Sequence, residues 1–202
     1  GETPGILKSG LHEPAFFEEF WRTLRQTGHW HGEILDRARD GRILPLLQTI
    51  SEVRDASGTL THHISVITDI SSIKETQSRL DFLAHHDVLT ELPNRLLFSD
   101  RLRHVIERAE RDSEAIALLF IDLDHFKNIN DSLGHQVGDQ LLIEAARRLK
   151  GLVRRADTVA RLGGDEFVVL MENHASHAAA ESLAEKVVAA FRRYAVDGVM
   201  IG

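Results

Sequence analysis

The sequence contains no cysteine, which excludes disulfide bonds, thiolate nucleophiles and thiolate metal sites. A chain without disulfides fits a reducing compartment, so we expect a cytoplasmic location. Long apolar runs are missing too, since the longest, AIALLFI at 115–121, is far shorter than the roughly 20 residues that span a bilayer. We therefore expect no membrane contact within these residues. No signal peptide is visible and the first residue is not methionine, so the chain reads as an excerpt.

Positive charge is also scarce. The chain has 24 Lys and Arg against 31 Asp and Glu, a net charge of −7, so we expect no nucleic-acid partner. A phosphate-bearing ligand must then be held locally, by a metal, by backbone N–H groups or by a few basic side chains. The sequence has no GxxxxGK[ST] motif either, which excludes a P-loop.

The 202 residues, 43% of them apolar, suffice for one large or two small domains with buried cores. Residues 1–70 predict an antiparallel sheet beside one helix. The helix is expected at 16–28, because Phe16, Phe20 and Leu24 recur at four-residue spacing before Gly28. The strands are expected at 30–37, 43–53 and 60–70, separated by Asp40-Gly41 and Ser57-Gly58 turns.

Residues 71–86 predict a helical linker. Ser71 or Ser72 can cap it, and Ile73, Leu80 and Leu83 form a heptad-like apolar stripe. The stripe is too short to establish a coiled coil, but it suits a rigid connector that pairs with a second copy of the chain.

Residues 87–202 alternate helices with strands and one hairpin. The fold class that we expect for the whole chain is therefore α/β (α+β), with helices packed over a mixed sheet in this second part. Helices are expected at 95–112, capped by Asn94, at 137–153 and at 176–196; strands are expected at 115–124, 158–162, 167–171 and 199–201. The strand at 115–124 is apolar on both faces, which predicts a central position in the sheet.

Four acids lie at the ends of these strands. Asp122 and Asp124 close the apolar strand and, two residues apart, are expected on one face of it. Asp165 and Glu166 lie at the tip of the hairpin. If the strands are neighbours the carboxylates converge, and a divalent cation relieves their repulsion, the arrangement for phosphoryl or nucleotidyl transfer. The alternative is an ordinary polar strand end.

Gly163 and Gly164 precede these acids. Glycine permits a positive φ and lets the backbone approach a ligand closely. The residues by themselves leave two readings open, a phosphate or base site and a plain hairpin.

Residues 163–167 spell GGDEF, and the similarity extends over HDVLTELPNR (86–95), FIDLDHFKNINDSLGHQVGDQLL (120–142) and RRADTVARLGGDEF (154–167). Together these segments resemble the diguanylate cyclase (GGDEF) domain, with Glu91 departing from the glycine common in the family. The resemblance implies a mixed sheet flanked by helices, like that of nucleotide cyclases and polymerase palms. It also implies condensation of two GTP into cyclic di-GMP, with release of two pyrophosphates, at the interface of a homodimer that uses Mg²⁺ or Mn²⁺.

The same resemblance assigns site residues by position. It implies Asp122, the Leu123 carbonyl, Asp165 and Glu166 as metal ligands, with Asp165 and Glu166 also catalytic; Asn130 and Asp139 as readers of guanine; and Phe126, Lys127, Gly163 and Gly164 as further substrate-binding residues. It further implies product inhibition by cyclic di-GMP at an RxxD motif, matched by Arg154 and Asp157. A surface salt bridge is the alternative for that pair.

Residues 1–70 resemble the later part of a PAS sensory domain, through Trp30, Gly32, Glu33 and Asp69-Ile70-Ser71 among others. Its cofactor, if it has one, cannot be assigned. The resemblance implies that both domains are incomplete here, the GGDEF domain at its C-terminal end. The 202 residues alone therefore need not convert GTP to cyclic di-GMP. Three function classes stay open: a regulated cyclase, a module that binds GTP or cyclic di-GMP and controls a downstream phosphodiesterase (EAL) domain, and a PAS dimerisation scaffold.

Overall fold

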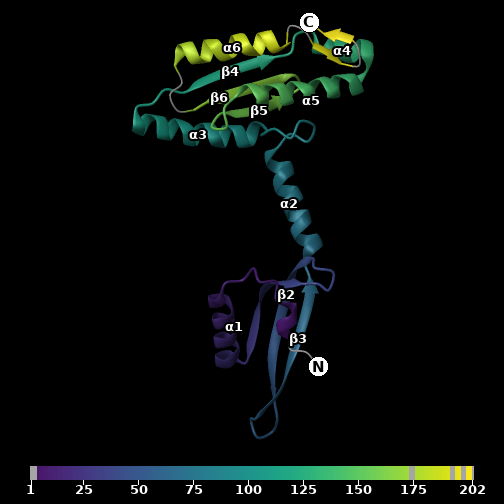
Figure 1. The fold of residues 1–202 in the computed structure, drawn as a ribbon, viewed down its shortest axis with the longest axis vertical. Coiled ribbons are helices and arrows are strands. Elements are labelled where there is room, and N and C mark those ends of the chain that lie inside the picture. The colour runs from purple at the N-terminus through teal and green to yellow at the C-terminus, as the bar shows by residue number, and fades with distance from the viewer. Residues whose placement is uncertain (1–3, 173–175, 192–193, 197–198, 202) are drawn as a thin grey trace. The chain divides into compact units, whose positions relative to one another are not determined.

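The computed structural model describes residues 4–172, 176–191, 194–196 and 199–201. The chain divides into two compact units, Gly1–Arg79 and Leu80–Gly202, and each is described by itself (Figure 1).

The first unit is one helix packed on a three-stranded antiparallel sheet. After a 3₁₀ turn at Pro4–Leu7, its elements are α1 (Pro14–Thr27), β1 (His29–Arg37), β2 (Ile43–Arg54) and β3 (Leu60–Asp69), with strand order β1-β2-β3. Gly28 ends α1 with a φ of 75°, and Gly41 and Gly58 take positive φ in the two hairpin turns. The predicted helix, strands and turns are therefore confirmed, with bounds that differ by one or two residues.

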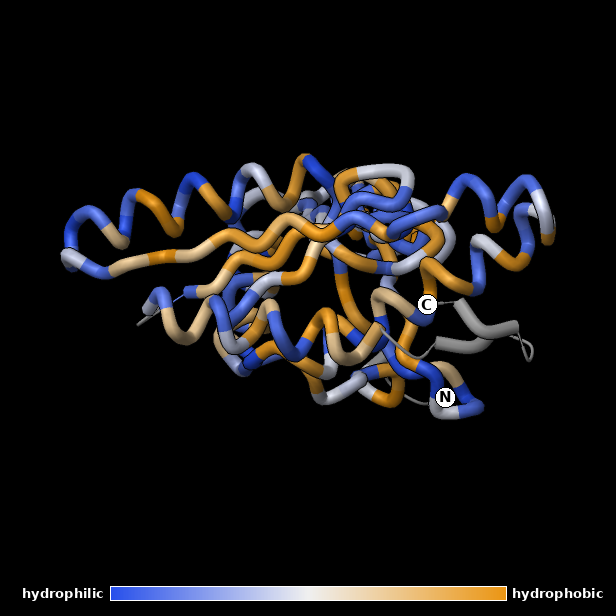
Figure 2. Tube along the Cα trace, turned by 90° about the horizontal axis from the view of Figure 1, so that it is seen from above, coloured by the Kyte–Doolittle hydropathy of each residue, from blue (hydrophilic) through white to orange (hydrophobic). Residues whose placement is uncertain are grey.

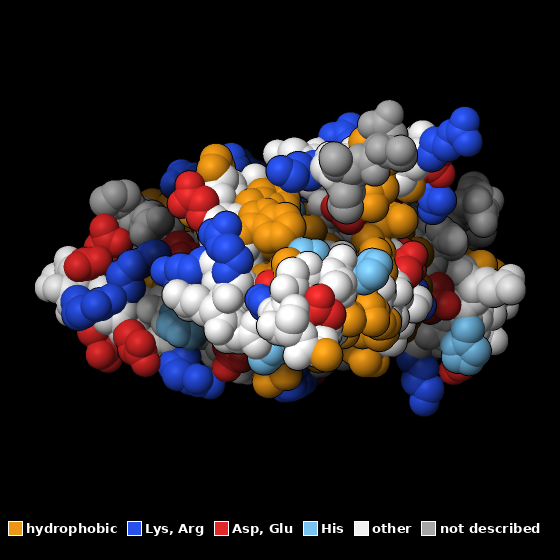
Figure 3. All heavy atoms as spheres, turned by 90° about the horizontal axis from the view of Figure 1, so that it is seen from below, with side chains coloured by type: hydrophobic (Ala, Val, Ile, Leu, Met, Phe, Trp, Pro, Cys, Tyr) orange, Lys and Arg blue, Asp and Glu red, His pale blue; other side chains and the backbone are white. Residues whose placement is uncertain are grey.

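The core of this unit is small and aromatic. Phe20, Leu24, Trp30 and Ile50 are buried between α1 and the sheet, whereas every residue of β3 is exposed. On the face shown in Figure 3, basic and acidic side chains are interspersed around exposed apolar groups, and no extended field of one charge is visible.

Helix α2 (Ser71–His85) runs across the boundary between the units and, among the described residues, buries none of its own. Ile73 and Leu80 of the predicted stripe are 60% and 61% exposed. Asp69 supplies the cap, since its carboxylate accepts a hydrogen bond from the Ser71 N–H at 2.8 Å; the prediction that a serine caps this helix was wrong.

The second unit is a sheet covered by helices on both faces (Figure 1). Its elements are α3 (Arg95–Asp112), β4 (Ala117–Asp122), α4 (Phe126–Leu133), α5 (His135–Leu152), β5 (Thr158–Gly163), β6 (Glu166–Met171), α6 (His177–Phe191), β7 (Tyr194–Val196) and β8 (Val199–Ile201). The antiparallel sheet has the order β4-β6-β5. Helix α3 packs on one face, and α5 and α6 on the other. Figure 2 shows the alternating hydropathy along the helices and the mainly hydrophobic strands that this layering requires.

The central strand of this sheet is β6. Phe167, Val168, Val169 and Leu170 of β6 are completely buried, because helices cover both of its faces. Strand β4 was predicted to be central, but it lies at the edge of the three described strands. Its residues alternate in burial, and Phe120 is 72% exposed. The prediction of a central strand was therefore wrong: it rested on the apolar run alone, whereas α3 leaves part of one face of β4 uncovered.

Two further predictions need correction. Residues 126–133, for which the sequence predicted neither a helix nor a strand, form helix α4, with Phe126, Ile129 and Leu133 recurring at helical spacing. Tyr194–Val196, expected at the end of the last helix, form β7, which pairs with β8. The Asp197-Gly198 dipeptide, which predicts a turn before the last strand, lies outside the described residues.

Candidate functional site

The acids expected to converge do lie at one end of the sheet. Asp122, the last residue of β4, is paired directly with Glu166, the first residue of β6, and Asp165 precedes Glu166 at the hairpin tip. Repulsion from the Asp165 carboxylate is the largest cause that raises the pKa of Asp122 above its ordinary value, followed by burial and by repulsion from Glu166 and Asp124. The sheet therefore concentrates negative charge at this edge.

The donor atoms at this edge fit a hard cation. Carboxylate and carbonyl oxygens are the ligands that Mg²⁺ takes, usually with water and substrate phosphates. The Leu123 carbonyl accepts one hydrogen bond, from the Phe126 N–H at 3.2 Å, which leaves its second lone pair for a ligand. Among the described residues no three His, Asp or Glu side chains are already drawn together as a metal site, so a cation would have to gather the carboxylates. Asp124 lies beyond the end of β4, contrary to the expectation that it shares a strand face with Asp122.

The two signature glycines occupy backbone conformations that favour glycine. Gly163 has a φ of 139° and Gly164 a φ of 53°, and the pairing of β5 with β6 shifts register between Arg161 and Gly163. The hairpin tip is thus an irregular turn that only residues without a Cβ enter at low cost.

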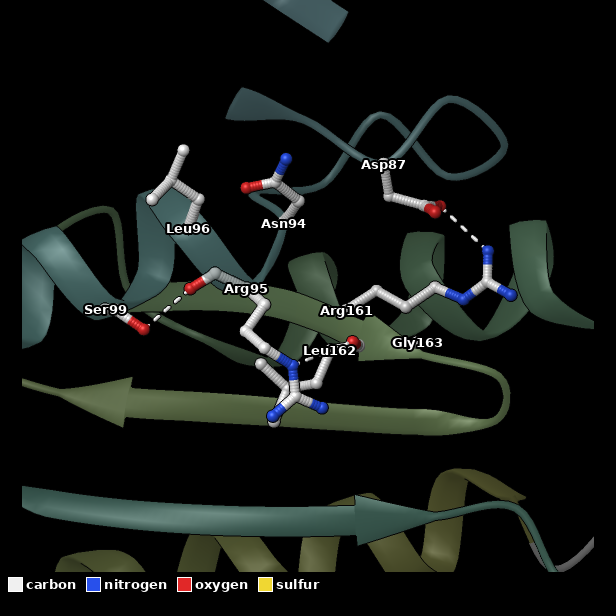
Figure 4. Close-up of a pocket in the computed structure, with 8 residues that line it drawn as sticks. All are labelled: Asp87, Asn94, Arg95, Leu96, Ser99, Arg161, Leu162 and Gly163. Atoms are coloured by element: carbon white, nitrogen blue, oxygen red, sulfur yellow. Dashed lines mark hydrogen bonds and ion pairs between the residues drawn. The ribbon is translucent and has the colours of Figure 1, made fainter. Parts of the chain in front are cut away.

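Arg161 fixes this tip from within β5. Its Nε and Nη2 donate to the Gly164 carbonyl at 2.9 and 2.7 Å, and its Nη1 donates to Asp87 at 2.9 Å. Asp87 also accepts from the N–H and hydroxyl of Thr90. Figure 4 shows the Arg161 side chain reaching from β5 to Asp87. The turn that follows α2 is therefore tied to the backbone immediately before Asp165.

Two pockets flank the hairpin. One, of about 500 Å³, is lined by residues of the α3 N-terminus and β5, including Arg95, Ser99 and Gly163 (Figure 4). The other, of about 370 Å³, is lined by Arg95, Asp122 and Glu166 among others. Arg95 lines both pockets and lies 3.5 Å from the Glu166 carboxylate, so it places a positive charge beside the acids.

The residues expected to read guanine lie on neighbouring helices. Asn130 belongs to α4 and Asp139 to α5, and the two helices form a hairpin around Gly134. Asn130 is half-buried and Asp139 exposed. The Asn130 Oδ1 atom is shut off from solvent and has no hydrogen-bond partner among the described residues. A buried acceptor without a donor is unfavourable and suits a ligand that supplies one.

Phe126 and Lys127 begin helix α4, and three residues separate this helix from the end of β4 at Asp122. Lys127 is exposed and Phe126 half-buried against the α5 side of the core. Lys127 therefore provides a positive charge close in sequence to the acidic end of β4.

Arg154 and Asp157 lie at the opposite end of β5 from the hairpin tip. The six residues of β5 separate them from the acids by roughly 20 Å. The Asp157 carboxylate accepts backbone N–H bonds from Arg154 at 3.0 Å and from Glu172 at 3.3 Å, while the Arg154 side chain is exposed. The structure does not bring this pair to the acidic edge, so any ligand there would occupy a separate site.

Sequence reasoning missed Asp87, Arg95, Gly138 and Arg161. All four lie inside or next to the quoted motif segments. Their roles depend on hydrogen bonds, ion pairs or close approaches to particular partner residues, and no local pattern indicates those partners.

Comparison with known proteins places these features in a family. The model of the diguanylate cyclase GGDEF domain matches residues 84–199. The chain is 52% identical over 118 residues to the bifunctional diguanylate cyclase/cyclic di-GMP phosphodiesterase MucR of Pseudomonas aeruginosa, a match covering 58% of this chain and 17% of MucR. It is 46% identical over 120 residues to the diguanylate cyclase TpbB of the same species, covering 59% of this chain and 28% of TpbB. The chain thus spans less than a third of either relative.

Solved structures agree with this match. The GGDEF domain of TpbB aligns with a TM-score of 0.55 at 46% identity, covering 58% of this chain and 70% of that one. The coiled coil and GGDEF domain of DgcB from Caulobacter crescentus, solved with c-di-GMP, aligns with a TM-score of 0.58 at 28% identity, covering 65% and 69%. The acidic edge, the glycine hairpin and the helices beside them are those of a GGDEF domain, and the chain belongs to the diguanylate cyclase GGDEF family.

Proposed function

We propose that the protein is a diguanylate cyclase that condenses two GTP molecules into cyclic di-GMP. The observation that carries the proposal is the meeting of Asp122, Asp165 and Glu166 at one sheet edge, with an electrostatically raised Asp122 pKa. Acids held this close repel one another, Arg95 offsets only the charge of Glu166, and their oxygens suit Mg²⁺ or Mn²⁺. When bound, the cation would neutralise charge on the triphosphate and polarise the α-phosphate.

The reaction needs two sites that face one another. The 3′-oxygen of one GTP attacks the α-phosphorus of the other, the bond to the β-phosphate oxygen breaks, and pyrophosphate leaves; the same step in the opposite direction closes the ring. Asp165 and Glu166 would hold the cation that faces the reacting phosphate, and Glu166 would either assist that cation or take the proton of the hydroxyl. Because the product is two-fold symmetric, we propose an isologous homodimer in which each copy holds one GTP.

Regulation is proposed at two places. Arg154 and Asp157, remote from the acidic edge, would bind cyclic di-GMP and inhibit turnover, since an exposed guanidinium can fork onto a phosphate or a guanine edge. Residues 1–70 would act as a PAS-type sensory input. Helix α2, with its exposed apolar stripe, would pair with its copy and set the distance between the two half-sites.

A second candidate is a GGDEF module that binds nucleotide without turnover. Two further relatives, NbdA of Pseudomonas aeruginosa and PdeR of Escherichia coli, each 38% identical, are named as cyclic di-GMP phosphodiesterases. In such a protein the GGDEF domain would control a separate hydrolase domain. The acids and glycines of this chain, all present at the hairpin, favour the cyclase.

The deciding experiment incubates the natural full-length protein with GTP and Mg²⁺ and follows cyclic di-GMP by chromatography. The proposal expects product from the unchanged protein and none from Asp165→Ala or Glu166→Ala. Arg103→Ala, which alters an exposed ion pair on the outer side of α3, is the matched control and should keep full activity. Binding of GTP without product would support the second candidate and overturn the first.

A further inference from the structure

Gly138 lies within helix α5, where glycine is unfavourable. A glycine in a helix interior costs roughly 0.5–1 kcal/mol relative to alanine. Gly138 is buried and has no positive φ that would require glycine. Its presence must therefore answer a need for space.

The space at Gly138 is taken by Asn130. A Cβ built on Gly138 would lie 1.9 Å from Asn130 Oδ1 and 2.9 Å from Asn130 Cγ, and 3.3 Å from Cε2 of Phe126. The first two distances are impossible for real atoms, so any side chain at 138 displaces the Asn130 amide. Gly151, in the same helix, has no described atom within 4 Å of the equivalent position, so closeness is not a general property of α5.

The Asn130 amide rests in this space with one hydrogen bond missing. Its Oδ1 is buried and has no donor among the described residues. Helices α4 and α5 thus hold this acceptor closely against the backbone of Gly138. A base that presents N–H groups supplies the missing donor, and Asp139, the next residue after Gly138, is a second acceptor beside it.

We propose that Gly138 is the positioning residue that sets base specificity, because its missing side chain fixes the Asn130 amide where it can accept from the exocyclic amino group of guanine. This inference rests on the proposed guanine-nucleotide function. It adds to that function a cause of base specificity: Gly138, without contacting the ligand, would let the protein distinguish guanine from a base that lacks the 2-amino group.

The test measures binding of two unreactive nucleotides to the full-length protein with Mg²⁺ by calorimetry. The probes are the α,β-methylene analogues of GTP and of inosine triphosphate, which differ only in the 2-amino group. The unchanged protein should prefer the guanosine analogue by about tenfold or more, the effect of one buried acceptor gaining or losing its donor. Gly138→Ala should reduce this preference to within about twofold, whereas the matched control Gly151→Ala should keep it.

A double substitution separates the specific contact from general damage to the helix. Asn130→Ala removes the atoms that clash, so adding Gly138→Ala to it should not change the binding preference further and should not lower the melting midpoint, because alanine is favoured over glycine in a helix. The double variant should therefore be more stable than Gly138→Ala alone. This comparison stands even if Gly138→Ala folds poorly. A Gly138→Ala protein that keeps the preference, or a double variant no more stable than the single one, overturns the inference. An unchanged protein that binds neither analogue overturns the proposed function as well.

Discussion

Replacing Arg161 tests whether the hairpin tip is held from outside or is stable by itself. The Arg161 side chain is only 11% exposed and makes three hydrogen bonds, two to the Gly164 carbonyl and one to Asp87. Hydrogen bonds that involve a charged group contribute about 1.5–3 kcal/mol, and breaking a fully buried ion pair costs about 3–5 kcal/mol. Because Asp87 is 24% exposed and keeps Thr90 as a partner, we expect Arg161→Ala to cost about 2–4 kcal/mol, below the sum of the separate bonds.

The stability of Arg161→Lys should lie between that of the unchanged protein and that of Arg161→Ala. A lysine ammonium can reach the Gly164 carbonyl or Asp87, but it cannot bond to both as the guanidinium does. Arg103→Ala is the control, since its ion pair with Asp100 is 65% and 42% exposed and should contribute less than about 1 kcal/mol.

Urea unfolding followed by two signals separates the units. Both tryptophans, Trp21 and Trp30, lie in the first unit, so their fluorescence reports that unit alone, while far-UV circular dichroism reports both. Arg161→Ala should lower the urea midpoint of the second unit, which is seen by circular dichroism, and should leave the fluorescence transition of the first unit unchanged. Amide hydrogen exchange at 164–166 should also become faster. If Arg161→Ala stays within about 0.5 kcal/mol of the unchanged protein and exchange at the tip does not change, the hairpin is not held by this side chain.

Four further predictions concern single groups. Asp122→Asn should raise the melting midpoint at neutral pH, because the pKa of Asp122 is raised and the ionised carboxylate therefore lowers stability once pH exceeds that pKa. The same substitution should abolish the stabilisation by added Mg²⁺. In calorimetry at pH 3, where the carboxyl is protonated, it should not raise the melting midpoint. Gly164→Ala should cost about 1–2 kcal/mol in urea unfolding, because its φ is 53°. Arg154→Ala should abolish calorimetric binding of cyclic di-GMP yet leave binding of the GTP analogue unchanged. Burial alone would raise the pKa of Asp87, but its hydrogen bonds to Thr90 and Arg161 outweigh burial and lower the pKa. The stability that this carboxylate contributes is therefore complete above the ordinary aspartate pKa and is lost as pH falls through the lowered value. Asp87→Asn should accordingly be less stable at neutral pH and should lose less stability on acidification, as measured by acid unfolding.

The elements of the fold were predictable wherever a local pattern decides them. The Asn94 cap of α3 is confirmed, with the Leu97 N–H donating to its side chain at 3.1 Å, and Gly28 ends α1 as expected. The position of β4 was not predictable, because apolar residues on both faces suit a central strand and an incompletely covered edge strand equally. Helix α4 was missed because its eight residues are rich in Asn, Asp and Ser, which favour turns as readily as helices.

The site divides along the same line. The acids could be predicted from the sequence because they follow an apolar strand and a pair of glycines, both of which are local patterns. Antiparallel pairing of β4 with β6 then brings Asp122 opposite Glu166. What holds them there could not be found, because Arg161 meets Asp87 across 74 residues of chain and no residue type identifies that partner. The turn after α2 and the glycine hairpin are thereby joined through one guanidinium. A displacement of Asp87 would therefore reach the Gly164 backbone, next to Asp165, without passing through the hydrophobic core.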